Sequence, residues 1–428
     1  MKPISINPEL FTANRERLKK LLRKNSLAIL NANDIMPTNA DGTMGFHQNA
    51  DLLYLTGIGQ EETILTLAPD AFEEKLREVL FVREPNEHLR IWEGHKLSKE
   101  EASKISGIKT VKWLSEFETV FRQLMCEAER VYLNSNEHYR ARVEVESRDA
   151  RFIHECQRRY PLHEYQRLAR LMHQLRVVKS PLEIELIQKA SAITGQGFER
   201  VLKLVKPGVN EAEIEAEFAH EFIRQRAEFA YLPIIATGEN NCVLHYGQND
   251  RVCNSGELVL LDVAAGYGEY MSDLTRTIPV NGRFTRRQKQ VYNAVLRVFY
   301  QIIKGMVPGK TILDLRKDAE ALIQEECLEL GLLKAAQIKR QDPDNPAVRT
   351  YFMHGVSHPI GLDVHDVLYA SQKIEPGWVL TCEPAIYIQK EGFGVRLENT
   401  VLVTESGQAD LMAEIPIEAD EIEERMAR

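Results

Sequence analysis

Short apolar runs alternate with amphipathic stretches over the first 160 or so residues of the chain. We expect helices at residues 9–24, 96–105 and 116–129, where apolar and charged side chains are interleaved. The apolar runs between them favour strands, and they lie at 26–30, 51–55, 63–67, 78–82, 110–114 and 130–133. Strands interleaved with helices predict an α/β layer domain.

A second region begins close to residues 164–178, which we expect to form one long helix. After it come Ser180 and Glu183 with a proline between them, a combination typical of a helix start. The serine can cap the helix, the proline suits the first position, and the glutamate can bond back to the cap. We expect this helix to run to about Lys206, where a Pro-Gly pair stops it.

The C-terminal region contains what looks like a degenerate internal repeat. One helix ends at Pro207-Gly208 and another begins after it, and about a hundred residues later the same arrangement occurs around Pro308-Gly309. Each helix pair precedes a strand-rich stretch, which suggests two similar halves around a shared sheet, although Pro-Gly helix stops are common. We divide the chain into an N-terminal domain, residues 1–173, and a C-terminal domain, residues 174–428.

Two aspartates are the first candidate site residues. Asp262 lies in the apolar run LVLLDV, and Asp273 follows it in a segment that reads as the return strand. A turn at residues 266–268 would bring both to one place. In a simpler alternative, one aspartate caps the turn and the other faces solvent. An aspartate in the middle of an apolar run is hard to reconcile with this, because a buried carboxylate needs a partner or a metal ion.

Three of the twelve histidines fall within twelve residues, at His354, His358 and His365, together with Asp363 and Asp366. Glycine and proline between them predict strand and loop rather than a helical zinc site. A lone histidine is more often structural than functional. A cluster of this kind favours a metal or catalytic site.

Two glutamates, Glu383 and Glu398, each interrupt a run of strand-forming residues, and Arg396 stands beside the second. Either glutamate could face solvent, and Arg396 could be a structural counter-charge or could bind a carboxylate. Four carboxylates with imidazole nitrogen suit manganese, with cobalt, iron and zinc as alternatives. Because carboxylates can bridge two cations that share a hydroxide, a two-metal site is consistent with the pattern.

Composition narrows the functional class. Lys and Arg number 54 against 63 Asp and Glu, a net charge of −9, which argues against a nucleic-acid partner. The N-terminus lacks the apolar core of a signal peptide, and no stretch approaches the roughly 18 apolar residues that span a bilayer. The six cysteines are scattered without CxxC pairs, so we expect reduced thiols, a cytoplasmic protein and no membrane association.

At these residues the sequence resembles the aminopeptidase P and prolidase branch of the pita-bread metallopeptidases, over nearly the whole chain. The resemblance implies an α/β N-terminal domain followed by an α+β pita-bread catalytic domain. It implies two divalent metal ions, with Mn²⁺ as the leading expectation. The five metal-ligand positions of the family fall, in order, on Asp262, Asp273, His358, Glu383 and Glu398.

The same resemblance assigns roles to the remaining site residues. Asp262 and Glu398 would bridge the metals, and Glu383 would also carry a proton from the nucleophile to the leaving nitrogen. The family's other site positions match His245, His354, His365 and Arg396. His354 and His365 would contact the peptide and stabilise the tetrahedral intermediate. His245 would lie near the site, and Arg396 would support the final ligand.

Residues 46–67 and 90–97 resemble the aminopeptidase P N-terminal domain. In bacterial members the tryptophan matching Trp92 lies near a neighbouring subunit's active site, which implies a homodimer or homotetramer, although a packed aromatic is an equal alternative.

The function implied is an Xaa-Pro aminopeptidase, acting on peptides with proline at the second position. An Xaa-Pro dipeptidase (prolidase) is the nearest alternative, because it shares every ligand and a proline such as Pro359 also follows the ligand histidine in prolidases. A non-catalytic peptide-binding module on the same fold is a third hypothesis. The retention of all five ligand positions argues against it.

Overall fold

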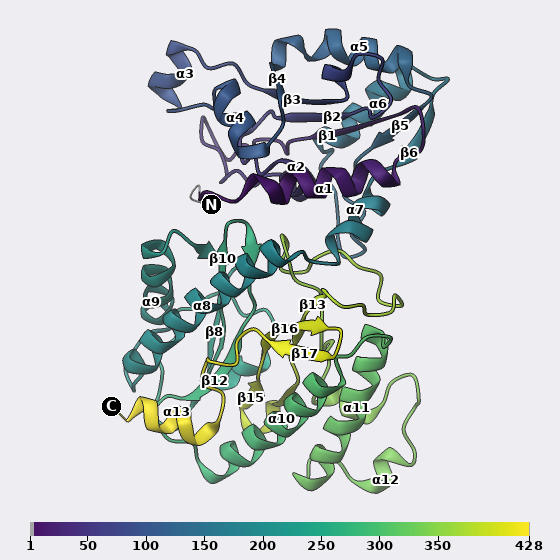
Figure 1. Cartoon of the computed structure of the whole chain (residues 1–428). Coiled ribbons are helices and arrows are strands. Elements are labelled where there is room, and N and C mark those ends of the chain that lie inside the picture. Colours follow the sequence, from purple (N-terminus) through teal and green to yellow (C-terminus); the bar gives the residue numbers. More distant parts are fainter. Residues whose placement is uncertain (1–3, 428) are drawn as a thin grey trace. The chain divides into compact units, whose positions relative to one another are not determined.

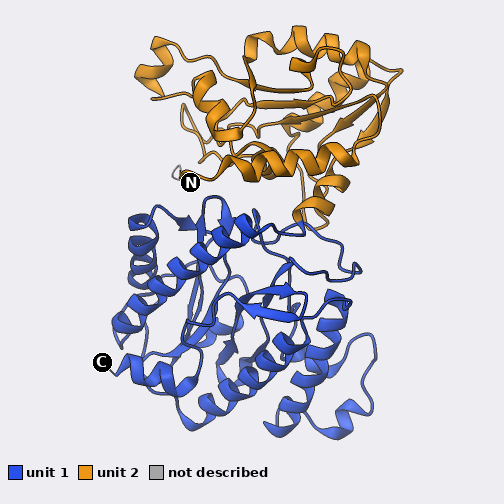
Figure 2. Ribbon diagram, viewed as in Figure 1, with its two compact units in different colours: residues 1–2, 177–428 blue, residues 3–176 orange. Residues whose placement is uncertain are grey.

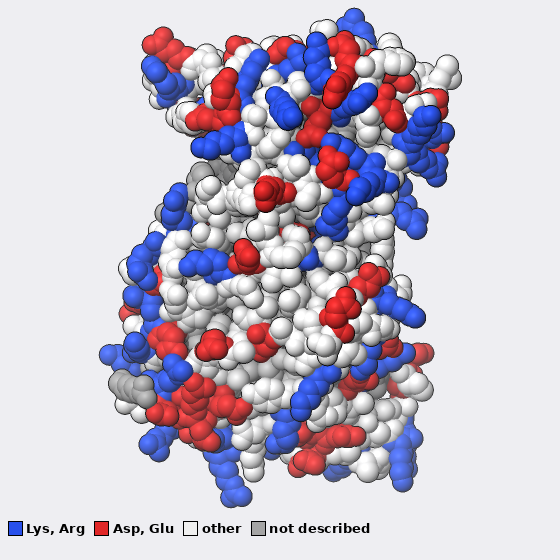
Figure 3. Space-filling model, in the orientation of Figure 1, with Lys and Arg blue, Asp and Glu red and all other residues white. Residues whose placement is uncertain are grey.

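The computed structural model describes residues 4–427, which divide into two compact units, residues 4–176 and residues 177–427 (Figure 2). Within these residues no helix combines the length and the apolar character needed to cross a bilayer. All six cysteines are unpaired thiols. On the face shown in Figure 3, Lys and Arg side chains are interspersed with Asp and Glu.

The N-terminal unit is built on a six-stranded mixed sheet in the order β4-β3-β2-β1-β5-β6 (Figure 1). Its strands are β1 (Ser26–Asn31), β2 (Ile64–Leu67), β3 (Glu78–Val82), β4 (Thr110–Trp113), β5 (Arg130–Leu133) and β6 (Glu164–Arg167). Its helices are α1 (Pro8–Leu21), α2 (Ala50–Thr56), α3 (Glu87–Trp92), α4 (Lys99–Ser106), α5 (Phe117–Glu127), α6 (Arg148–Arg159) and α7 (Ala169–Arg176).

The alternation of side chains along the central strands explains why helices cover both faces of this sheet. In β1, Leu27 and Ile29 face a core formed with α5 and α6, and the intervening Ala28 and Leu30 are also buried. In Figure 1, α1 lies on one side of the sheet and α5 on the other. The predicted α/β layer architecture is confirmed.

Two predictions in this unit are wrong. The apolar run at 51–55 forms helix α2 rather than a strand, because Asn49 caps its start and Gly57 ends it in the left-handed conformation, φ 66°. Residues 164–178 are not one helix. Residues 164–167 pair with β5 as edge strand β6, and only the residues from Ala169 onward are helical.

Asp149, in the first turn of α6, is only 8% exposed and accepts a hydrogen bond from Asn31 Nδ2 at 3.0 Å. Burial is the largest effect on this carboxyl. Together with the negative charges of Asp51 and Asp34 it outweighs the Asn31 hydrogen bond and the charge of Arg148, and it raises the pKa of Asp149 to about 7.

This raised pKa predicts that the chain loses stability as the pH rises. An unfolded aspartate ionises near pH 4, so between about pH 4 and 7 the folded state binds more protons and the free energy of unfolding falls. A shift of about 3 units corresponds to at most roughly 4 kcal/mol. We expect Asp149→Asn to melt above wild type at pH 8 but not at pH 4. A melting difference independent of pH would contradict this assignment.

The C-terminal unit contains two modules, each a helix pair followed by antiparallel strands (Figure 1). The first has α8 (Pro181–Leu204), α9 (Glu211–Arg224), β7 (Glu228–Phe229), β8 (Ile234–Thr237), β9 (Leu258–Asp262), β10 (Ala265–Tyr267), β11 (Tyr270–Met271) and β12 (Thr275–Pro279). The second has α10 (Arg286–Gly305), α11 (Ile312–Glu329), α12 (Ala335–Ile338), β13 (Val379–Cys382), β14 (Ala385–Ile388), β15 (Phe393–Arg396), β16 (Asn399–Thr404), β17 (Gly407–Asp410) and α13 (Ala419–Met426).

The helix start at Ser180 and Glu183 forms the expected reciprocal capping box, and α8 ends at Leu204, two residues before the predicted end. The two modules share one continuous core. They also join through the backbone, because Glu398 N donates to Thr275 O at 3.0 Å and so links the segment before β16 to β12. The predicted pita-bread class of this unit is supported by this pairing of similar halves.

Candidate metal centre

The β9–β12 hairpin brings the two predicted aspartates to one end of a sheet. Asp262 is the last residue of β9 and lies opposite Thr275 of β12, and Asp273 stands two residues before that partner. Between them the chain makes a smaller hairpin, β10–β11. Its turn contains Gly268 and Glu269 in the left-handed conformation, φ 60° and 66°, so the turn falls slightly later than predicted.

Tyr231 lies between these two carboxylates. Its hydroxyl is 2.6 Å from Asp262 Oδ1 and 2.6 Å from Asp273 Oδ1. A phenol has one proton and can donate it to only one of them at a time. The second carboxylate therefore faces an oxygen without a hydrogen bond, an arrangement that a cation would relieve.

The two glutamates reach the same place from the second module. Glu383 follows β13 directly, and its backbone N donates to Val356 O. Glu398 lies between β15 and β16, where Thr275 Oγ1 donates to its Oε2 at 2.7 Å. Asp262, Thr275 and Glu398 are thus neighbours across adjacent backbone segments.

His358 comes from a segment without regular structure that pairs along β13. Its backbone N and O bond to Thr381 Oγ1 and N. Its Nε2 lies 3.4 Å from Asp273 Oδ2 and 3.9 Å from Glu383 Oε1. One ligand atom each from Asp273, His358 and Glu398 lie within 4.8 Å of one another, and all three residues are buried.

The carbonyl of Gly355 sets the tautomer of His354. A carbonyl oxygen can only accept, so His354 Nδ1 carries the ring proton and donates it to Gly355 O at 2.6 Å. In the neutral ring Nε2 then accepts from the Tyr387 hydroxyl at 2.9 Å, and that hydroxyl accepts from Arg396 NH1 at 2.7 Å. His354 Nδ1 also lies 3.5 Å from Glu383 Oε2. Burial, reinforced by the charge of Arg396, lowers the pKa of His354 to about 3, so the ring is neutral.

Arg396 connects this network to the first module. It is 4% exposed, and its NH2 donates to Asp262 Oδ2 at 2.5 Å while its Nε donates to Thr275 Oγ1 at 3.2 Å. One guanidinium therefore orients Asp262, Tyr387 and the threonine that holds Glu398. Holding three partners with the three nitrogens of one rigid, planar group is a use that suits arginine.

The remaining predicted histidines lie at the exposed side of the cluster. His365 is exposed, and its ring packs edge-on against His358 with the centroids 4.2 Å apart. His245 is exposed as well, and it is near enough to His354 to contribute to the lowered pKa of that ring.

The carboxylates are too crowded to be ionised together without added positive charge. Burial, and then the neighbouring carboxylates, raise the pKa of Asp273, Glu383 and Glu398 well above the usual range. Glu398 Oε1 is buried, and no residue of the described chain donates a hydrogen bond to it. Oxygen-rich donors with one imidazole and an unsatisfied carboxylate oxygen fit divalent cations.

Comparison with known families agrees with this geometry. The model described as metallopeptidase family M24 matches residues 185–405, which is about half of the chain, and the aminopeptidase P N-terminal domain matches residues 11–132. The chain belongs to metallopeptidase family M24. As an M24 member it is a hydrolase, and the predicted enzyme class and fold are confirmed.

Individual relatives match this M24 chain from end to end. It is 32% identical to the Xaa-Pro aminopeptidase of Escherichia coli and 34% identical to that of Haemophilus influenzae, over 98% of this chain and at least 97% of each relative. Among solved structures, the zinc-substituted E. coli aminopeptidase P in complex with product has a TM-score of 0.87 at 32% identity. Aminopeptidase PepP of Pseudomonas aeruginosa has a TM-score of 0.88 at 30% identity, and each covers 99% of both chains.

Three residues of this M24 site were not found from the sequence: Tyr231, Thr275 and Tyr387. Tyr231 precedes the strand-forming segment PIIAT and gave no signal of its own. Thr275 and Tyr387 lie in strands rich in residues of similar type, and only their neighbours across the sheet reveal what they hold.

Proposed function

We propose that this chain is an Xaa-Pro aminopeptidase, which hydrolyses the peptide bond between an N-terminal residue and a following proline. The observation that carries the proposal is the convergence of Asp262, Asp273, His358, Glu383 and Glu398 in a chain that resembles aminopeptidase P over its whole length. Divalent cations are the cofactors that such a donor set fits.

The five residues would hold two divalent cations, and we propose Mn²⁺ because four of the five donors are carboxylates. When bound, a pair of such cations acts as a Lewis acid and makes water nucleophilic near neutral pH. The chain supplies the orientation. Arg396 and Thr275 fix the carboxylates of Asp262 and Glu398 through the hydrogen bonds described above.

Glu383 is placed to move a proton. Its Oε1 faces His358 and its Oε2 faces His354, while its side chain remains 18% exposed. We infer that Glu383 takes up the proton released when water attacks the peptide carbonyl and passes it to the proline nitrogen. His354, neutral and held by Tyr387 and Gly355, lies 3.5 Å from Glu383 on the other side.

The exposed imidazoles would bind the peptide. His365 and His245 are open to solvent at the edge of the cluster. His354 would reach the peptide only by exchanging one of its two hydrogen bonds, since both of its ring nitrogens have partners. We propose that His365 and His354 contact the peptide, His354 after exchanging one of these hydrogen bonds, and that His245 lies beside them.

Substrate length tests the proposed activity against its nearest alternative. With Mn²⁺ supplied, we expect Ala-Pro-Ala to be cleaved to alanine and Pro-Ala, and the dipeptide Ala-Pro to be cleaved at least about 10-fold more slowly. Release of alanine from each peptide, measured by chromatography, checks this. Faster hydrolysis of Ala-Pro would identify a dipeptidase, and Ala-Ala-Ala as the preferred substrate would refute recognition of proline.

We also propose that the active species is a homodimer or homotetramer. Trp92, in the short helix α3, is 75% exposed and the adjacent Ile91 is 69% exposed, so two neighbouring large apolar side chains are open to solvent. Burial of this pair against a neighbouring copy would remove that surface from water. The molar mass in solution, measured by light scattering, tests the proposal.

We propose that the chain is located in the cytoplasm. Six unpaired thiols, four of them buried, in a chain of this length support this proposal.

A further inference from the structure

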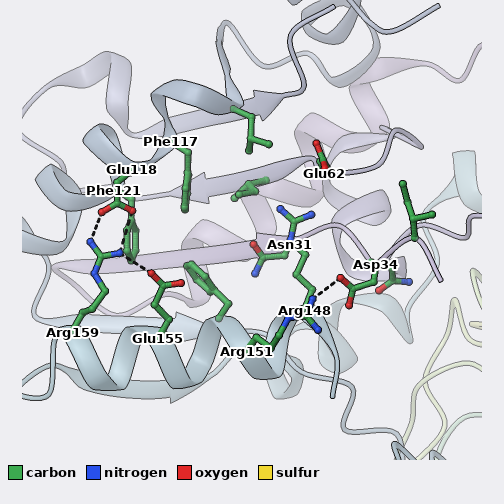
Figure 4. A pocket seen from close by; sticks show the side chains of 15 residues that line it. Asn31, Asp34, Glu62, Phe117, Glu118, Phe121, Arg148, Arg151, Glu155 and Arg159 are labelled. Atoms are coloured by element: carbon green, nitrogen blue, oxygen red, sulfur yellow. Dashed lines mark hydrogen bonds and ion pairs between the residues drawn. The ribbon is translucent and has the colours of Figure 1, made fainter. Parts of the chain in front are cut away.

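The N-terminal unit contains a cavity of about 700 Å³ that no part of the metal centre uses (Figure 4). It lies against strands β1 and β2, helix α5 and one face of helix α6. From α6 the residues Arg148, Arg151, Phe152, Glu155 and Arg159 contribute, at the spacing of a single helical stripe. A cavity of this volume accommodates a small organic molecule.

One wall of the cavity is aromatic. Phe117 and Phe121 stack with their ring centroids 5.3 Å apart, and Phe152 lies 5.6 Å from Phe121 and 6.2 Å from Phe117. Phe117 and Phe152 are only partly buried, so their rings remain available to an apolar group. Such a wall favours a ligand with an aromatic or aliphatic side chain.

The cavity has an unpaired cation at one end. Arg151 is engaged by Asp34 at 2.6 Å, and Glu62 lies 3.6 Å from Arg83. For the guanidinium of Arg148, by contrast, the described chain provides no hydrogen bond and no ion pair within 4.0 Å, although it is partly buried. Burial is the largest effect on this guanidinium and lowers the pKa of Arg148, while the charges of Glu62, Asp34 and Asp149 act in the opposite direction without forming an ion pair with it. An anionic group is the missing partner.

The other end has an excess of negative charge. Arg159 is shared between two carboxylates, those of Glu118 and Glu155, so one negative charge there is not neutralised (Figure 4). Both carboxylates are about half exposed and can accept a further donor. Arg148 and Glu155 are seven residues apart on α6, which places them roughly 10 Å apart along its axis.

Opposite charges separated in this way match a zwitterion. In an extended chain each residue spans about 3.3–3.6 Å, so the ammonium and carboxylate of a tripeptide are also roughly 10 Å apart. We propose that this cavity binds a short peptide with free ends, whose carboxylate pairs with Arg148, whose ammonium meets Glu118 and Glu155, and whose central apolar side chain lies on the phenylalanine wall. The site is separate from the metal centre and does not rest on the proposed peptidase activity.

Calorimetric titration of the full chain with Ala-Phe-Ala, its N-acetyl derivative and its C-terminal amide tests the proposal. We expect saturable binding of the free tripeptide, at least 10-fold weaker binding of each capped form, and at least 10-fold weaker binding of Ala-Phe-Ala to Arg148→Met. Arg158→Met, an exposed arginine of the same helix, is the matched control and should bind as wild type. Turnover of Ala-Pro-Ala should be unchanged in both variants.

The ends of the peptide can be assigned separately. In Arg148→Met the acid and amide forms should bind equally, whereas in Glu118→Gln combined with Glu155→Gln the free and acetylated amines should bind equally. Each result identifies one end without requiring the other variant to fold. The proposal is overturned if wild type shows no saturable binding, if capping has no effect, or if Arg148→Met binds Ala-Phe-Ala as tightly as wild type. Binding at the metal centre would be common to all variants.

Discussion

Glu383→Gln is expected to fold normally and to cleave Ala-Pro-Ala at least about 100-fold more slowly than wild type. The amide preserves the volume of the side chain but cannot carry the proton to the leaving nitrogen, a contribution typically worth 10²–10⁴ in rate. Glu383→Ala removes a metal donor as well, so its loss should be at least as large. Neither variant should recover fully in excess Mn²⁺. Steady-state kinetics and circular dichroism check both expectations.

A glutamate outside the site provides the control for this substitution. Glu391, in the turn between β14 and β15, is exposed but is held by Arg287 at 2.7 Å. Glu405, in the turn between β16 and β17, is exposed and forms no hydrogen bond or ion pair within the described chain, so Glu405→Gln is the cleaner control. Wild-type turnover of Glu383→Gln, or a large loss in Glu405→Gln, would refute the role given to Glu383.

Asp273→Asn is expected to lower both metal content and activity, the latter by about 1000-fold or more, because metal catalysis is worth several kcal/mol. The same change should stabilise the metal-free chain. Asp273 is 5% exposed and shares the Tyr231 hydroxyl with Asp262, so a neutral amide in its place avoids the cost of keeping this carboxyl, whose pKa is raised, among buried carboxylates.

Asp273→Asn should therefore stabilise the metal-free chain and destabilise the metal-bound chain. This combination distinguishes a metal ligand from a structural residue. After chelation, the variant should melt at a higher temperature than wild type, and with Mn²⁺ present it should melt at a lower one. Asp344→Asn, at an exposed position of the same unit, should change neither. A variant that retained full metal content and activity would show that Asp273 is not a ligand.

Local patterns predicted most of the elements but failed where tertiary pairing or caps decided the outcome. Residues 51–55 have the composition of a strand, yet Asn49 and Gly57 supply caps that a short helix needs. Residues 164–167 are part of a helical pattern in the sequence, but they pair with the edge of β5 and form a strand. In both places the deciding interaction lies outside the segment itself.

The candidate site was predictable to the extent that its residues were anomalous in their surroundings. Asp262 and Glu398 were found because charges rarely interrupt buried strands. Thr275 and Tyr387 are ordinary strand residues, so nothing local marks them. Their importance comes from register, which places Thr275 opposite Asp262 and beside Glu398. Tyr231 was missed for a similar reason, since only the hairpin fold places two carboxylates at its hydroxyl.

The central claim is that the five converging residues hold two divalent cations on which Xaa-Pro cleavage depends. The most direct test is to strip the wild-type chain with a chelator, return Mn²⁺ in steps, and measure bound metal and Ala-Pro-Ala turnover on the same samples. We predict no turnover without metal, and activity that rises until two ions are bound per chain. Full turnover in the stripped chain, or activity unrelated to bound metal, would contradict the account.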